Sequence, residues 1–104
     1  MNDPQTPPNA PFPGRAKRID AILRQAFAPT LLQVTDDSSK HAGHAGAAPG
    51  GETHFSVLCV SDAFAGQNRV LRSRAVHELL AGELAGGLHA LALNLRTTEE
   101  QERL

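Results

Sequence analysis

The sequence contains no tryptophan, no tyrosine and a single cysteine in 104 residues. One cysteine cannot form a disulfide within the chain, and such usage is typical of a reducing compartment. No apolar run approaches the roughly 20 residues that a membrane-spanning helix needs, and the N-terminus lacks the apolar core of a secretion signal. The formal net charge is only −1, so no overall attraction to nucleic acid exists. We therefore expect a cytoplasmic protein.

The sequence also lacks the short motifs of common catalytic sites. It has no Gly-x-Ser-x-Gly nucleophile motif, no P-loop and no dinucleotide-binding glycine pattern. Its length predicts one small domain with a modest core and little room for an enclosed substrate cavity. By strand parity Cys59 lies with Phe55 and Val57, which indicates a buried structural cysteine. We therefore predict a protein without enzymatic activity.

Two segments show no regular pattern of apolar residues. Residues 1–14 hold five of the seven prolines, and because proline removes backbone donors this segment is predicted to be a disordered tail. The folded domain is expected over residues 15–104. Residues 37–51 contain four glycines and one proline, which predicts a loop. A loop of this length inside a small domain is typically functional or disordered.

Hydrophobic spacing predicts the regular elements of the domain. Helices are expected over residues 15–27 and about 68–84, strands over residues 31–36, 53–61 and 89–95, and a short last helix capped by Thr97 or Thr98. The loop between the first two strands has no room for a crossover helix, so these strands should pair antiparallel. The helix between the second and third strands predicts a parallel, right-handed connection. The fold class is therefore α+β, a three-stranded mixed sheet with helices on one face in the order α-β-β-α-β-α.

Histidines are the main soft ligands that the sequence offers. His41 and His44 lie in the loop, His54 opens the second strand, His77 lies in the long helix and His89 opens the third strand. Spacing alone favours ordinary roles, with His41 and His44 solvated and His89 partly buried because its parity matches that of Leu91. Two histidines can nevertheless replace two cysteines on one iron of a 2Fe–2S cluster. The chain could supply half of such a site if a partner brought the thiolates.

Three arginines form a basic cluster at the start of the long helix. Arg69, Arg72 and Arg74 lie in its first two turns. An ordinary solvated helix surface and a phosphate-contacting patch are both compatible with this pattern. The cluster lacks neighbouring aromatic residues on which bases could stack, and a chain of this net charge would bind nucleic acid weakly unless it were a homodimer.

Five short motifs give the chain a resemblance to the BolA family from about residue 15 to residue 97. They are Thr35–His41 (TDDSSKH), Gly51–Phe55 (GETHF), Val60–Gly66 (VSDAFAG), Arg72–Val76 (RSRAV) and His89–Leu93 (HALAL). The resemblance implies a fold related to the type II KH domain. It also implies a non-enzymatic partner of monothiol glutaredoxins that shares a 2Fe–2S cluster, with sulfur ligands from the glutaredoxin and glutathione. The expected role is iron–sulfur cluster assembly or trafficking, or iron and redox regulation.

The resemblance assigns ligands to positions of this sequence. His89 matches the family's strand histidine. The loop ligand is His41 when counted from the preceding acidic-serine motif, and His44 when counted back from Gly51. The alternative function is a DNA-binding transcriptional regulator that uses Arg69, Arg72 and Arg74. Two departures bear on that alternative, because Ser73 stands where family members often have histidine and the Gly-x-x-Gly loop of KH domains is absent.

Overall fold

The computed structural model describes residues 14–38 and 52–104. Along the chain its elements are α1 (Arg15–Phe27), β1 (Leu31–Asp36), β2 (His54–Val60), η2 (Asp62–Phe64), α2 (Arg69–Leu79), α3 (Ala81–Ala85), β3 (Ala90–Arg96) and α4 (Thr98–Glu102). The predicted disordered tail lies outside the described residues except for Gly14, as does the predicted loop from residue 39 to residue 51. None of the helices in the described ranges is long and apolar enough to cross a membrane.

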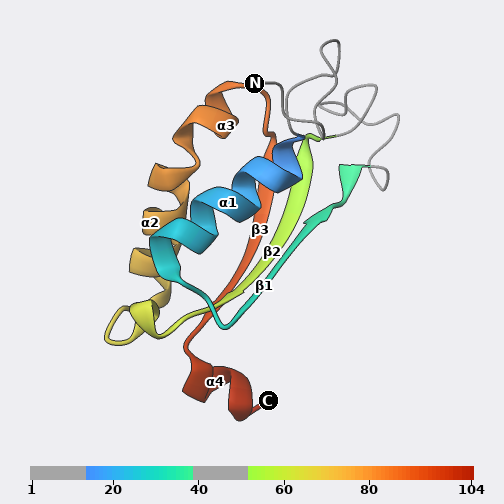
Figure 1. Ribbon diagram of the computed structural model, residues 1–104. Coiled ribbons are helices and arrows are strands. Elements are labelled where there is room, and N and C mark those ends of the chain that lie inside the picture. The colour runs from blue at the N-terminus through green and yellow to red at the C-terminus, as the bar shows by residue number, and fades with distance from the viewer. Residues whose placement is uncertain (1–13, 39–51) are drawn as a thin grey trace, which may run out of the picture.

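The three strands form one mixed sheet with β2 in the centre. β1 pairs antiparallel with β2, where Val34 lies opposite Val57, and β3 pairs parallel with β2, where Val57 lies opposite Leu93. Figure 1 shows α1 and the α2–α3 pair on one side of this sheet, and α4 beyond the end of β3. The predicted fold class, strand directions and element order are therefore confirmed.

The core lies between the sheet and the helices. Alternate residues of β2 point to the helical side, which buries them together with the apolar faces of α1 and α2. The fully buried side chains of this cluster are Ile19, Leu23, Phe55, Val57, Cys59, Phe64, Val76 and Leu80. Full burial of one such aliphatic or aromatic side chain contributes about 1.5–3 kcal/mol to folding. The predicted burial of Cys59 is confirmed.

The predicted helix over residues 68–84 is interrupted at Leu80. There the backbone adopts φ −97° and ψ 13° between α2 and α3, although the Leu80 side chain remains fully buried. The bend lets α3 carry Glu83 to α1, where it pairs with Arg15 and Arg18. After α3 the chain turns at Gly87, which has φ +123°, a conformation that side-chain-bearing residues rarely adopt.

Candidate functional site

The starts of β2 and β3 bring two histidines together. The parallel register places His54 opposite Ala90, and the rings of His54 and His89 lie 5.9 Å apart between centroids. The N–H groups of His89 and Ala90 both donate to the Thr53 carbonyl oxygen, at 2.7 and 3.0 Å. His89 is exposed, which corrects the expectation from parity that it is partly buried. The strand begins at Ala90, so the alternation of β3 does not extend to His89.

His54 is the residue near this position that sequence reasoning did not assign to a site. Its Nδ1 lies 2.9 Å from the Thr53 hydroxyl oxygen, and its side chain is half-buried. Each of two strands predicted to be parallel opened with a histidine, and parallel strands begin at the same edge of a sheet. That combination was the available signal for the His54–His89 pair.

Hydrogen bonds fix both ends of the segment between β1 and β2 beside these histidines. Asp36 accepts from the Ser38 N–H at 2.8 Å and from the Glu52 N–H at 3.1 Å. The Ser38 hydroxyl oxygen accepts from the Thr53 N–H at 2.8 Å and from the His54 N–H at 3.1 Å. Burial opposes ionisation of Asp36, but the hydrogen bonds from Ser38 and Glu52 prevail and lower its pKa. The acidic-serine motif therefore anchors residues 38 and 52 at the histidine end of the sheet.

An ion-pair network connects this end of the sheet to the helices. Arg15 donates through Nε to Glu83 at 2.8 Å and through Nη2 to the Gly86 carbonyl oxygen at 3.0 Å, and its backbone N–H donates to the Glu52 carboxylate at 2.7 Å. Arg18 donates to the same Glu83 carboxylate. The hydrogen bonds from Arg18, followed by that from Arg15, lower the pKa of Glu83 to about 2 against the effect of burial. Glu83 is therefore ionised at neutral pH.

The available metal ligands here are nitrogen atoms and do not complete a site. In the described part of the chain, no three His, Cys, Asp or Glu residues are grouped to hold a metal ion. Cys59 is fully buried in the core, and this burial raises the pKa of its thiol to about 11, so its sulfur is not presented at the surface beside the histidines. His77 lies apart on α2, with its Nδ1 2.8 Å from the Ser73 carbonyl oxygen. The predicted loop ligands His41 and His44 lie outside the described residues.

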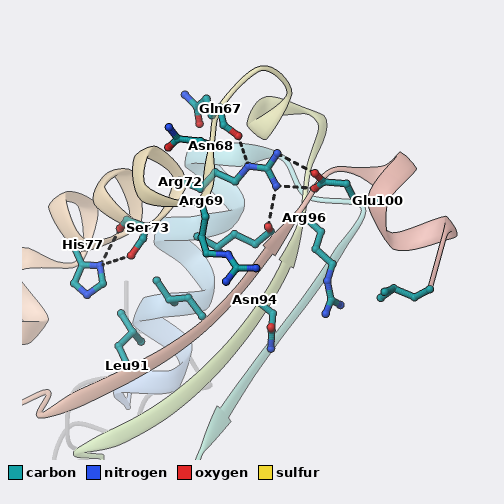
Figure 2. Close-up of a pocket in the computed structure, with 13 residues that line it drawn as sticks. Gln67, Asn68, Arg69, Arg72, Ser73, His77, Leu91, Asn94, Arg96 and Glu100 are labelled. Carbon is teal, nitrogen blue, oxygen red and sulfur yellow. Dashed lines mark hydrogen bonds and ion pairs between the residues drawn. The ribbon is translucent and has the colours of Figure 1, made fainter.

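The three arginines of the predicted basic patch do not act alike. Arg69 and Arg74 are exposed, whereas the Arg72 side chain is only 11% exposed and pairs with Glu100. Arg72 also donates through Nε to the Gln67 carbonyl oxygen at 2.8 Å and through Nη1 to the Leu95 carbonyl oxygen at 3.0 Å (Figure 2).

The pKa of Glu100 reflects its contact with Arg72. The hydrogen bonds from Arg72, followed by that from the Thr97 N–H, lower its pKa to about 2. The guanidinium of Arg72 also lies 5.8 Å from the centre of the Phe64 ring. Arg72 therefore holds α2, β3 and α4 together, and only Arg69 and Arg74 of the three present free charge.

These observations define a small α+β domain with an exposed imidazole at the start of its edge strand and an incomplete ligand set. The family model described as BolA-like protein matches residues 23–100. The chain belongs to the BolA family, which confirms the resemblance noted in its motifs.

Curated relatives support the same assignment. An uncharacterized protein from the cobS 5' region of a Sinorhizobium species is 45% identical over 86 residues, which cover 82% of this chain and 92% of the relative. The DNA-binding transcriptional regulator BolA of Escherichia coli K12 is 43% identical over 88 residues, which cover 85% of this chain and 80% of the relative. SufE-like protein 1 of Arabidopsis thaliana, named as chloroplastic/mitochondrial, is 44% identical over 90 residues that cover 83% of this chain but only 24% of the relative. The predicted cytoplasmic location stays a prediction.

Solved structures agree with the fold. The BolA domain of SufE1 from Arabidopsis thaliana has a TM-score of 0.76 at 42% identity and covers 86% of this chain and 99% of that chain. BolA1 from Mus musculus has a TM-score of 0.71 at 33% identity and covers 99% of this chain and 81% of that chain. The similarity to type II KH domains stays a prediction.

Proposed function

We propose that this BolA-family chain is a non-enzymatic adaptor that binds a monothiol glutaredoxin and co-ligates a shared 2Fe–2S cluster. His89 and one of His41 or His44 supply imidazole nitrogen, and the glutaredoxin and glutathione supply sulfur. Such an adaptor acts in iron–sulfur cluster assembly or trafficking, or in iron and redox regulation. The observation that carries the proposal is the exposure of His89 beside the anchored ends of the segment that contains the other two histidines.

The covalent reach of the chain supports the proposed pairing. The Ser38 hydroxyl oxygen accepts a hydrogen bond from the Thr53 N–H at 2.8 Å, and the Thr53 carbonyl oxygen accepts one from the His89 N–H at 2.7 Å. His41 follows Ser38 by three residues and His44 by six, and an extended chain spans at most about 10 and 20 Å over these separations. These separations allow either histidine to reach an iron held at His89.

The ligand chemistry also supports a site completed by a partner. With Cys59 buried and protonated, the chain offers nitrogen ligands and needs sulfur from elsewhere. A bound cluster would supply one-electron chemistry, at a potential raised by histidine ligation. Because imidazole must be neutral to bind metal, we expect this chain to hold its share of the cluster less well as pH falls.

Anaerobic reconstitution with a monothiol glutaredoxin and glutathione tests the proposal, followed by visible absorption and circular dichroism. We expect His89→Ala to abolish the spectrum of the mixed cluster while glutaredoxin binding is retained. His77→Ala is the matched control, because His77 is also exposed but lies on α2. An unchanged spectrum with His89→Ala would remove His89 from the site, and His41→Ala, His44→Ala and His54→Ala identify the second nitrogen ligand.

A second candidate function, DNA binding, is favoured by the exposure of Arg69 and Arg74 and by the name of the Escherichia coli relative. It predicts affinity for a duplex that falls steeply as salt rises. Fluorescence anisotropy with a 20-base-pair duplex, comparing the native chain with an Arg69→Glu/Arg74→Glu double variant, measures both effects. Equal affinity of the two chains would exclude these arginines as DNA contacts.

A further inference from the structure

A groove follows the outer edge of β3. It has a volume of about 660 Å³ and lies between α2, β3 and α4. Arg69 borders it from α2, Arg96 and Asn94 border it from β3, and the Arg72–Glu100 pair closes one end (Figure 2). Because Arg72 and Glu100 neutralise each other, the remaining arginine side chains of the lining are Arg69 and Arg96, and Arg96 also donates to the Gln101 side-chain oxygen at 3.0 Å.

The backbone of β3 shows which of its groups face this groove. The Ala90 N–H bonds to the Thr53 carbonyl oxygen, and the Arg96 carbonyl oxygen accepts from the Ser61 N–H. In a parallel ladder, alternate residues direct both backbone groups to the same neighbour. Even-numbered residues of β3 therefore bond toward β2, and the odd-numbered residues Leu91, Leu93 and Leu95 direct their N–H and C=O groups away from it.

This free edge is occupied at one end only. The Leu95 carbonyl oxygen accepts from Arg72 Nη1 at 3.0 Å, as expected for an outward-facing group. No element of the described ranges pairs with β3 on this side, because the sheet order is β1-β2-β3. The backbone groups of Leu91 and Leu93 therefore face the groove and are available to an added strand.

We propose that this groove binds an extended acidic segment of a partner protein, which adds as a strand to the free edge of β3. Main-chain hydrogen bonds to Leu91 and Leu93 would hold the segment, as in other cases of strand addition. Successive residues of a strand point to opposite faces. Arg69 lies on the helical side of the sheet. Arg96 alternates with the leucines of β3 that face the core, so like Asn94 it belongs to the opposite face. Two adjacent acidic residues would therefore present one carboxylate to each arginine.

Other occupants fit this surface less well. A second copy of the chain would bring Arg69 and Arg96 of each copy toward the same edge, where like charges repel. The segment over residues 1–14 contains five prolines, which lack the N–H that strand pairing requires. For single-stranded nucleic acid, His77 is the one aromatic ring of the described residues that lines the groove, and the sequence has no tyrosine or tryptophan, so successive bases would have no row of rings on which to stack.

This surface goes beyond the proposed cluster site, because it lies along β3 and toward its C-terminal end, whereas His89 precedes the first residue of the strand. Variants of Arg69 or Arg96 leave His54, His89 and the anchored loop ends unchanged. Failure of peptide binding and failure of cluster sharing are therefore separate results.

The test is a titration of the 15N-labelled full chain with the acetylated and amidated octapeptide TVTEEVTV, monitored by NMR. We expect the amide signals of Leu91 and Leu93 to shift and their hydrogen exchange to slow. The matched peptide TVTQQVTV removes both carboxylates, and TVTEEVTV with N-methyl groups on alternate residues removes main-chain donors. Each change should weaken binding by about tenfold or more.

Protein variants provide the second arm. We expect Arg69→Glu and Arg96→Glu each to weaken binding of TVTEEVTV by about tenfold. Glutamate is favourable in the first turn of a helix, so Arg69→Glu should leave the fold intact. Arg74→Glu is the matched control, since Arg74 is an exposed arginine of α2 outside the groove, and it should bind as the native chain does. Absence of peptide binding, equal binding of all three peptides, or tighter binding of a ten-residue oligothymidylate at Leu91 and Leu93 would overturn the proposal.

Discussion

The two ends of β3 use polar side chains in opposite ways. At its end, the Arg72 guanidinium is only 11% exposed and binds Glu100 together with the carbonyl oxygens of Gln67 and Leu95. Before its start, His89 is exposed, and the surrounding hydrogen bonds join backbone to Ser38 and Asp36 instead of engaging its ring. At the C-terminal end of β3, Arg72 holds three elements together. Before its N-terminal end, the His89 ring remains accessible as a ligand.

This difference shows that residue type does not predict whether a side chain is accessible to a ligand. In the sequence, Arg72 belongs to a basic cluster that suggests phosphate contacts, and His89 has the parity of a partly buried strand residue. In the fold, Arg72 is instead largely buried and paired with Glu100, and His89 is exposed. Substitutions at the two ends should therefore differ in whether they affect stability or function.

The largest effect is expected for Arg72→Ala. It removes the hydrogen bonds to Gln67, Leu95 and Glu100, so the free energy of unfolding should fall by about 3 kcal/mol. Urea denaturation followed by far-ultraviolet circular dichroism measures this change. Arg74→Ala is the control and should stay within about 0.5 kcal/mol of the native chain. Equal stability of the two variants would mean that Arg72 does not hold the end of β3.

A smaller effect is expected for Ser38→Ala, at the last described residue before residues 39–51. Its hydroxyl oxygen accepts from the Thr53 and His54 N–H groups, and Ser38 and Thr53 are both buried. Loss of this acceptor should cost about 2 kcal/mol, because buried donors are left without a partner. Hydrogen exchange at these two amides tests the assignment directly. Unchanged exchange there would show that the loop ends are anchored by other contacts.

Glu83→Gln should reveal a pH-dependent contribution of about 1–3 kcal/mol. The pKa of Glu83 is lowered from 4.5 to about 2 in the folded chain, chiefly by Arg18. A carboxylate whose pKa falls on folding stabilises the fold above its unfolded pKa, and this contribution is lost as pH drops from about 5 toward 2. The stability of the native chain and of the variant should therefore differ at pH 7 and converge near pH 2. A constant difference across that window would contradict the ion pair.

The smallest effect on stability is expected for His89→Ala. Because the ring is exposed, its removal should change the free energy of unfolding by less than about 0.5 kcal/mol. Thermal unfolding measures it, with His77→Ala as the control on α2. A large loss of stability would give His89 a structural role and would weaken the contrast between the two ends of β3.

Local signals predicted most of the fold. The bounds of α1 and β1 follow from apolar spacing, from Pro29 after the helix and from β-branched residues in the strand. The sequence predicts Thr97 or Thr98 as the N-cap of α4. In the structure the N-cap is Thr97, whose hydroxyl oxygen accepts from the Glu100 N–H. These features depend on residues within a few positions of one another, which is why the sequence reports them.

Long-range features could not be predicted in the same way. The interruption at Leu80 depends on where Glu83 meets Arg15 and Arg18, more than 60 residues away in the chain. The pairing of Arg72 with Glu100 spans 28 residues. Each of these requires the packed arrangement of several elements, which periodicity and spacing do not determine.

The central claim is that His89 supplies a nitrogen ligand to a cluster shared with a glutaredoxin. Pulsed electron paramagnetic resonance of the reduced mixed cluster tests it, with 15N-histidine in this chain and unlabelled glutaredoxin and glutathione. We predict 15N hyperfine couplings from two imidazoles of this chain. An assembled cluster with no 15N coupling, or with couplings that His89→Ala leaves unchanged, would contradict the account.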